Sequence, residues 1–162
     1  MKSPEELTRI FRERGLKVTP QRQSIFRVLH GTGTHPTAEA VHAEVSAGMP
    51  TISLRTVYQT LNDLAAMGEI QAIDVGTGSV RFDPHVEEHH HLVCERCGRV
   101  QDLDADFPGV SLPADNPFGF QVTATEIVFR GLCRDCVALP SGDDAAPSAQ
   151  AMHIQSEEAK RA

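Results

Sequence analysis

The four cysteines of this chain occur as two CxxC pairs, and this arrangement constrains the fold more than any other feature of its 162 residues. A CxxC turn presents two thiolates to one tetrahedral ion, and a second pair completes a closed four-cysteine site that stabilises a fold. A chain of this length can bury a core without disulfides, so small size does not explain the cysteines. Because none is left over, the spacing favours a structural Zn²⁺ site over a thioredoxin-like redox pair or unrelated buried thiols. The predicted zinc ligands are Cys94, Cys97, Cys133 and Cys136.

Charge is unevenly distributed along the chain, whose net charge is −7. Residues 1–82 carry nine Lys and Arg against eight Asp and Glu, whereas residues 83–162 carry six against fourteen. A near-neutral half whose arginines could gather on one face, joined to an acidic half rich in metal-ligating side chains, indicates two domains with different partners. The charged N-terminus lacks a signal-peptide pattern, and no stretch is apolar enough to span a bilayer. These features predict a cytoplasmic protein with reduced thiols and no membrane partner.

The first half of the chain, residues 1–82, has the pattern of four helices followed by a hairpin. Ser or Thr caps, early prolines and glycine stops delimit segments whose apolar residues have helical spacing. These segments are residues 3–15, 19–31, 37–48 and 53–68. Two short strands, residues 69–75 and 79–84, flank a glycine-rich turn. Helices that close on such a hairpin form a winged helix-turn-helix, in which the helix before the hairpin enters the major groove.

The predicted recognition helix carries a polar stripe. Arg55, Tyr58 and Gln59 lie at positions i, i+3 and i+4, opposite the apolar residues of the helix. Arg suits a guanine edge, Gln an adenine edge, and Tyr a phosphate or a thymine methyl group. An ordinary solvated helix face is the alternative interpretation. The residues predicted to contact double-stranded DNA are Arg22, which would hold a backbone phosphate, and Arg55, Thr56, Tyr58 and Gln59.

The second half is expected to form a small α/β domain, which gives the whole chain an α+β fold. Residues 83–91 are polar, acidic and rich in histidine, as in a hinge between domains. Within residues 92–137, the segment "GFQVTATEIVFRGLC" alternates as a strand does, and a short or broken helix is expected near residues 107–117. Residues 138–162 contain few apolar anchors and are expected to form a disordered tail.

The histidines of "EEHHHLVC" indicate a second metal site. In an extended segment, residues two apart point the same way, so His89 and His91 share a face. Asp83 in the hinge and Asp102 beyond the first CxxC pair could bring carboxylates beside these two imidazoles. A nitrogen and oxygen ligand set of this kind suits iron, manganese or zinc, whereas a solvated, pH-sensitive loop is the alternative. His35 lies in a loop of the first half, where a lone histidine is by pattern alone more typical of a solvated side chain.

The chain resembles the ferric uptake regulator (Fur) family over about residues 5–137. The resemblance rests on "GLKVTPQR", "HPTAEAVHAEV", "ISLRTVYQTLNDLAAMGEI", "RFDPHVEEHHHLVCERCGRVQDLD" and the terminal "CRDC". It implies a homodimeric repressor that pairs an N-terminal winged helix with a C-terminal dimerisation domain and binds operator DNA when loaded with a sensed metal. It also implies that the four cysteines hold structural zinc and that Tyr58 contacts DNA. The sensing ligands that the resemblance implies are His35, Asp83, His89, His91 and Asp102.

Within the family, Asp102 and the full set of two aspartates and three histidines resemble the peroxide-responsive branch (PerR). In that branch, bound Fe²⁺ reacts with peroxide and a ligand histidine is oxidised, at positions matching His35 and His89, which releases the protein from DNA. The resemblance therefore implies Fe²⁺ or Mn²⁺ as the regulatory cofactor. A regulator of iron or manganese uptake is the alternative. A zinc-uptake regulator is less favoured, because regulators of that kind often place a cysteine in the sensing site and every cysteine here is assigned to structural zinc.

A metalloenzyme, for example a zinc hydrolase, is the alternative from another class. A catalytic site would keep an open coordination position beside a general base, whereas five candidate ligands around a hinge look saturated. The chain contains neither a GxSxG nor an HExxH motif. A CxxC oxidoreductase would require one exposed pair with a depressed thiol pKa, and the doubled motif argues against it. The sequence therefore predicts a regulator with no catalytic residues and no organic substrate.

Overall fold

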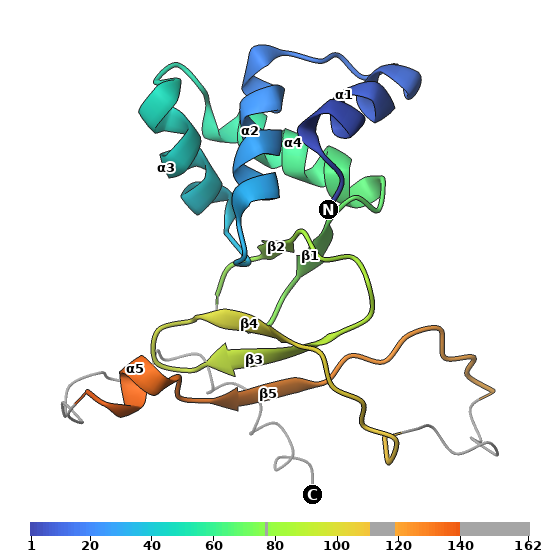
Figure 1. Cartoon of the computed structure of the whole chain (residues 1–162), viewed down its shortest axis with the longest axis vertical. Coiled ribbons are helices and arrows are strands. Elements are labelled where there is room, and N and C mark those ends of the chain that lie inside the picture. Colours follow the sequence, from blue (N-terminus) through green and yellow to red (C-terminus); the bar gives the residue numbers. More distant parts are fainter. Residues whose placement is uncertain (77, 111–118, 140–162) are drawn as a thin grey trace, which may run out of the picture.

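The computed structural model describes residues 1–76, 78–110 and 119–139. Four helices lie at one end of the molecule and a three-stranded sheet at the other, with a two-stranded sheet between them (Figure 1). The α+β fold is therefore confirmed. None of the helices in these ranges has the length and apolar character that crossing a bilayer requires.

The helices form where the caps and apolar spacing predict them. Their bounds are α1 Pro4–Glu13, α2 Pro20–Gly31, α3 Ala38–Gly48 and α4 Leu54–Ala66. Each follows a Ser or Thr whose side-chain oxygen accepts a hydrogen bond from a backbone N–H in the first turn. Such a cap typically contributes about 1 kcal/mol to helix stability, because it satisfies a donor that has no partner inside the helix.

One apolar cluster joins the four helices. Phe11 of α1 and Phe26 of α2 meet edge to face, with ring centroids 4.9 Å apart. Val57, Leu61 and Leu64 of α4 belong to the same cluster and are fully buried. Their spacing places one face of α4 in the core and leaves the opposite face to solvent, as a recognition helix requires.

The two-stranded sheet forms hydrogen bonds with the loop between α2 and α3, which contains His35. Its strands are β1 (Gln71–Ile73) and the antiparallel β2 (Arg81–Asp83). The backbone N–H of Phe82 donates to the carbonyl oxygen of Pro36 at 3.0 Å. Arg81 Nη1 donates to the carbonyl oxygen of His35 at 3.1 Å. These two bonds hold the loop between α2 and α3 beside the end of β2.

The three-stranded sheet has the order β4-β3-β5. It combines two strands from the beginning of the second half with one strand from near its end. Its strands are β3 (His90–Cys94), β4 (Val100–Leu103) and β5 (Val128–Gly131), and the short helix α5 (Arg134–Val137) follows. β4 runs antiparallel to β3, and β5 runs parallel to it. Val93 and Val100 pack with Ile73 and Val75 in a small second core, so the hairpin region of the first half contributes to the core of the second.

One expectation for the second half differs from the structure, and others are only partly covered by the described residues. Of the alternating segment 119–133, only Val128–Gly131 is a strand, because only these residues pair with β3. Where a short helix was expected, the described residues 107–110 form a turn, and residues 111–118 lie outside the described residues, as does most of the expected tail. The segment expected to be a hinge, 83–91, already enters β3 at His90.

Candidate metal centres

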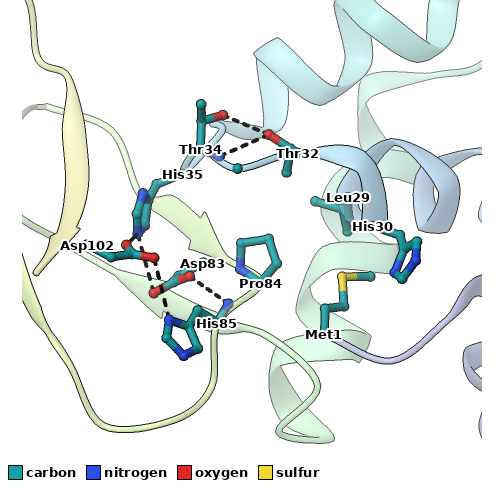
Figure 2. Close-up of a pocket in the computed structure, with 11 residues that line it drawn as sticks. Met1, Leu29, His30, Thr32, Thr34, His35, Asp83, Pro84, His85 and Asp102 are labelled. Carbon is teal, nitrogen blue, oxygen red and sulfur yellow. Dashed lines mark hydrogen bonds and ion pairs between the residues drawn. The ribbon is translucent and has the colours of Figure 1, made fainter. Parts of the chain in front are cut away.

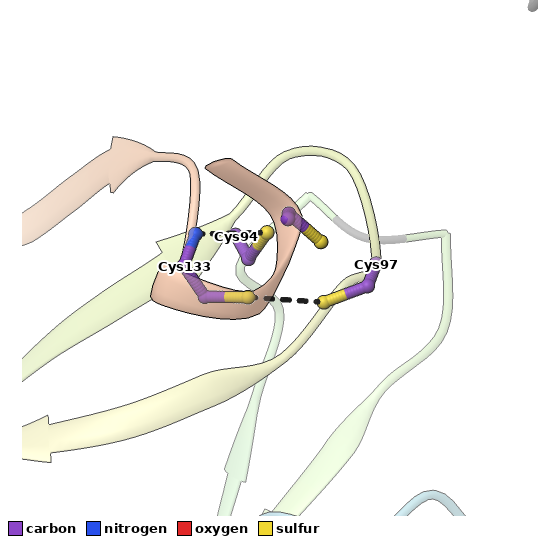
Figure 3. Close-up of side chains that lie close together, drawn as sticks. Cys94, Cys97 and Cys133 are labelled. Carbon is purple, nitrogen blue, oxygen red and sulfur yellow. Dashed lines mark hydrogen bonds between the residues drawn. The ribbon is translucent and has the colours of Figure 1, made fainter. Parts of the chain in front are cut away.

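The four cysteines converge at the end of the three-stranded sheet. One sulfur atom from each lies within 4.8 Å of the other three, and Figure 3 shows Cys94, Cys97 and Cys133 facing one another. The sulfur atoms of Cys97 and Cys133 are 3.8 Å apart. A tetrahedral site with Zn–S bonds of about 2.3 Å has its sulfur atoms about 3.8 Å apart. The cluster therefore fits Zn²⁺, and all four cysteines are free thiols without a disulfide.

Local backbone contacts hold the two CxxC turns together. The backbone N–H of Cys133 donates to the sulfur of Cys94 at 3.3 Å. This bond, with others from the first turn, lowers the pKa of the Cys94 thiol to about 6. Burial raises the pKa of Cys136 to about 12, and hydrogen bonds from the neighbouring thiols add to the effect. Four thiols this close cannot all ionise without a cation between them, because the thiolates repel one another. A bound divalent ion offsets this repulsion.

The second centre brings together the five residues that the resemblance implied. His35 comes from the loop between α2 and α3, Asp83 ends β2, His89 precedes β3, and His91 on β3 lies directly opposite Asp102 on β4. One ligand atom from each lies within 4.8 Å of the other four. Figure 2 shows His35, Asp83 and Asp102 directed toward one another from these separate elements. Residues far apart in the sequence thus meet at the junction of the two halves.

The separations between the ligand atoms suit a single cation. Ligand atoms about 2.1 Å from an octahedral metal ion are about 3.0 Å from their neighbours. His89 Nε2 lies 2.9 Å from Asp83 Oδ2 and 3.0 Å from His91 Nε2. His35 Nε2 lies 3.4 Å from Asp83 Oδ2 and 2.6 Å from Asp102 Oδ1. The three imidazoles all direct the same nitrogen, Nε2, into the centre.

Unsatisfied polar atoms give independent support for a metal here. Both ring nitrogens of His35 and Oδ2 of Asp83 are buried and have no hydrogen-bond partner among the described residues. Nε2 of His35 and Oδ2 of Asp83 therefore lie near each other without forming a well-directed hydrogen bond. Burial of such groups is costly unless they are paired or coordinate a metal. His35 is 4% exposed and Asp83 1% exposed, so bulk water has little access to either side chain.

Charge within the cluster is balanced between carboxylates and imidazoles. Burial lowers the pKa of His35, but the carboxylates of Asp83 and Asp102 outweigh it, and the net pKa is raised. Burial raises the pKa of Asp83, but the nearby imidazole of His35 and the hydrogen bond from the backbone N–H of His85 lower it on balance. A cation in the centre would replace the proton on His35 as the partner of these carboxylates.

Two residues beside this cluster were not predicted from the sequence. His85 stacks on the ring of His89, with centroids 4.5 Å apart and planes 9° from parallel, and its Nδ1 lies 3.5 Å from Asp102 Oδ2. Glu126 Oε1 lies 2.8 Å from His91 Nδ1. His85 is only two residues from Asp83, which was an available signal, whereas nothing in the sequence placed Glu126 beside His91.

The residues predicted to contact DNA fall into two groups. Arg55, Tyr58 and Gln59 are exposed on α4 and Thr56 is half-buried, so the polar stripe faces solvent. The Tyr58 hydroxyl donates to Glu39 Oε1 on α3 at 2.7 Å. Arg22 is instead paired within the helical half.

The guanidinium of Arg22 is engaged inside the helical half. Its Nη2 lies 2.7 Å from Asp63 Oδ2, and the Arg22 side chain is 12% exposed. Its Nη1 donates to the carbonyl oxygen of Lys17, and the group lies over the ring of Phe11 at 5.1 Å. These contacts join α1, α2 and α4, so Arg22 has a structural role whether or not it reaches a phosphate.

Comparison with known proteins identifies the kind of protein to which these centres belong. A sequence profile of the Ferric uptake regulator family matches residues 13–111, more than half of the chain. The chain belongs to this family. The peroxide-responsive repressor PerR of Staphylococcus aureus is 33% identical over 133 residues, which cover 82% of this chain and 90% of that repressor.

Solved structures of family members share the fold. The ferric uptake regulator of Helicobacter pylori superposes with a TM-score of 0.68 at 23% identity, covering 87% of this chain and all of that one. A zinc-bound manganese uptake regulator superposes with a TM-score of 0.62 at 26% identity, covering 82% of this chain and 99% of that one. The winged-helix and sheet arrangement described above is thus the arrangement of the Fur family.

Proposed function

We propose that this member of the Fur family is a metal-dependent transcriptional repressor that binds operator DNA as a homodimer in the cytoplasm and senses peroxide. The proposal assigns residues 1–82 to DNA binding, 83–91 to the hinge, 92–137 to dimerisation and 138–162 to a tail. Structural Zn²⁺ would be held by the four cysteines, and Fe²⁺ or Mn²⁺ by the five-residue sensing cluster. The observation that carries the proposal is the convergence of that cluster at the junction of the two halves.

The position of His35 supports a mechanism of metal control. His35 is the cluster member from the helical half, and the bonds at its backbone and at Pro36 tie its loop to β2. His91 and Asp102 belong to the three-stranded sheet. A cation shared by these residues favours one orientation of the helical half relative to the sheet, so metal binding shifts the population toward that orientation.

The exposed face of α4 supports DNA binding. Arg55, Tyr58 and Gln59 lie on it, and the helix packs into the core through its other face. In a winged helix, side chains in these positions reach base edges or phosphates in the major groove. Thr56 and Arg22 complete the proposed set, and Arg22 would have to exchange its ion pair with Asp63 for a phosphate contact.

The outer face of the sheet supports a dimer. Leu92 on β3 and Phe129 on β5 are register partners, and each is 40% exposed. Their side chains point away from His91 and Val93, which are buried on the inner face. Adjacent apolar side chains on an exposed sheet face are typical of an interface between subunits.

A cavity supports peroxide as the signal. A cavity of about 280 Å³ is lined by His35, Asp83, His85 and Asp102 on one side and by residues of α2 and its following loop on the other (Figure 2). The Asp102 side chain is 34% exposed, so a small solute can reach the edge of the centre. Fe²⁺, when bound there, supplies the reducing power that Mn²⁺ does not. On His35 or His89 the net change would be the gain of one oxygen atom from peroxide, with water as the other product.

The alternative function is regulation by metal supply. The structural similarity to a manganese uptake regulator favours it, because a metal site can control DNA binding through its occupancy alone. A zinc-uptake regulator is less favoured since no cysteine belongs to the sensing cluster, and a metalloenzyme is less favoured by the family membership.

The test is DNA binding by the zinc-loaded protein, followed by fluorescence anisotropy of operator-type DNA under anaerobic conditions. Fe²⁺ or Mn²⁺ is added, then a small peroxide dose, and peptide masses are read in parallel. We expect the iron form to lose DNA while peptides containing His35 or His89 gain one oxygen, and the manganese form to be unchanged. If both forms keep DNA without added oxygen, the protein responds to metal supply instead.

A matched pair of variants separates metal control from general damage. His35→Ala should abolish the metal dependence of DNA binding, whereas His42→Ala, at a histidine of α3 outside the cluster and its cavity, should leave it intact. Loss of metal dependence in both variants would contradict the assignment of His35 to the sensing cluster.

A further inference from the structure

Glu126 is the carboxylate that contacts the sensing cluster from outside its five members. Its Oε1 lies 2.8 Å from His91 Nδ1, the ring nitrogen that faces away from the cluster. We propose that Glu126 is a positioning residue, which holds His91 in the tautomer that presents Nε2 to the regulatory metal. This inference rests on the proposed function to the extent that the cluster binds a divalent ion.

The backbone around Glu126 is fixed beside β3. The N–H of His91 donates to the carbonyl oxygen of Ile127 at 3.0 Å. The N–H of Ile127 donates in turn to Nδ1 of His90 at 3.3 Å. The parallel pairing of β3 with β5 then places Val128 alongside His91. Glu126 therefore projects from an anchored chain, although its own side chain is 48% exposed.

A carboxylate contact decides which nitrogen of His91 carries the proton. An ionised carboxylate accepts hydrogen bonds and cannot donate them, so Nδ1 must be the N–H and Nε2 of the neutral ring keeps its lone pair. His91 is 2% exposed, so bulk water has little access to its ring nitrogens. In metal sites, a carboxylate on the far nitrogen of a ligand histidine fixes its orientation and increases its basicity.

The geometry also shows what would replace this arrangement without Glu126. His91 Nε2 lies 3.0 Å from His89 Nε2. His89 Nδ1 faces the carbonyl oxygen of Glu87 at 2.7 Å, which only accepts, so His89 Nε2 also carries a lone pair. If His91 took the other tautomer, its Nε2–H would donate to His89, and both metal-ligating nitrogens would be occupied by that hydrogen bond.

The three histidines of the cluster are therefore not equivalent. His89 is oriented by a neutral backbone carbonyl two residues away, and His91 by a charged side chain 35 residues away. Nδ1 of His35 has no hydrogen-bond partner among the described residues. A hydrogen bond to a charged acceptor is stronger than one to a neutral acceptor. His91 is thus the ligand whose donor strength depends most on a single side chain.

Three variants of the zinc-loaded protein test this role, with Mn²⁺ affinity measured from the electron paramagnetic resonance signal of free Mn²⁺. Glu126→Ala should weaken Mn²⁺ binding by about 10- to 100-fold, the usual effect of losing such a partner. Glu126→Gln keeps an acceptor oxygen without the charge, so its affinity should lie between those of wild type and Glu126→Ala. Glu44→Ala, which removes the same charge from an exposed position on α3, should bind as wild type does.

A second measurement reads the tautomer without any regulatory metal. In the ¹⁵N spectrum of the zinc-loaded protein, the His91 ring should carry its proton on Nδ1 in wild type and Glu126→Gln, and lose that preference in Glu126→Ala. The melting temperature and zinc content of each variant report whether the fold is intact. An Nδ1–H signal that persists in Glu126→Ala, or an Mn²⁺ affinity within twofold of wild type, overturns the inference. Failure of wild type itself to bind Mn²⁺ would count against the proposed function, which the tautomer measurement does not require.

Discussion

Removal of the structural zinc should unfold the three-stranded sheet while the helical half stays folded. The sheet has little apolar support, because its core consists of Ile73, Val75, Val93 and Val100, with Val128 partly buried against them. The helical half has a separate and larger cluster that includes residues of all four helices. The zinc cluster joins the end of β3 to the start of α5, across the sheet.

The free energies of apolar burial, chain ordering and zinc binding explain why the sheet should depend on zinc. Four buried Val and Ile side chains contribute about 6–12 kcal/mol at roughly 1.5–3 kcal/mol each. The strands β3, β4 and β5 have five, four and four residues. Ordering thirteen residues at about 1–2 kcal/mol each costs about 13–26 kcal/mol. Structural zinc contributes about 10–16 kcal/mol, so burial and zinc together match the ordering cost to within a few kcal/mol, whereas burial alone does not.

The assay is amide hydrogen exchange on protein stripped of zinc by a chelator, compared with the same sample after Zn²⁺ is restored. We expect amides of β3, β4 and β5 to lose protection while those of α1–α4 retain it, and restored zinc to reverse the loss. Cys133→Ser should behave as the stripped protein does, since a three-cysteine site binds zinc less tightly. Strand amides that remain protected after zinc loss would refute the claim that the metal supplies this part of the stability.

The other expectations concern pH, a buried ion pair and DNA. Because the pKa of His35 is raised, its contribution to the stability of the metal-free protein is full below the usual imidazole pKa of about 6.5 and is lost as pH rises through the raised value. Since the metal must displace that proton, Mn²⁺ affinity should increase with pH over the same interval, and a flat pH profile would contradict this. Arg22→Ala should lower the free energy of unfolding by about 1–3 kcal/mol, because it leaves the half-buried Asp63 carboxylate unpaired. Arg9→Ala, in an exposed ion pair, should change the free energy of unfolding by less than about 0.5 kcal/mol. Tyr58→Phe should weaken operator binding by about 1 kcal/mol, roughly fivefold in Kd. The melting temperature should change little, because the hydrogen bond that the hydroxyl donates to Glu39 is exposed to solvent.

Interactions between residues close in sequence made the helix starts, the cysteine cluster and the paired histidines predictable. Helix starts follow from Ser and Thr caps, since these side chains satisfy N–H groups only three residues away. The two CxxC pairs predict one four-sulfur cluster because the turn itself sets the spacing of each pair. The shared face of His89 and His91 likewise follows from the two-residue period of an extended chain. In each case the deciding interaction spans only a few residues.

Tertiary structure decided what depends on contacts between distant segments. By pattern alone His35 was an ordinary loop histidine, and only the bonds from β2 to its loop bring it to the cluster. Arg22, predicted on a phosphate, is paired with Asp63 from another helix. The alternating segment before β5 is not a strand, because alternation describes side chains and a strand also needs a partner. Glu126 reaches His91 through the parallel pairing of β3 and β5, a relation between residues 35 apart that no local pattern encodes.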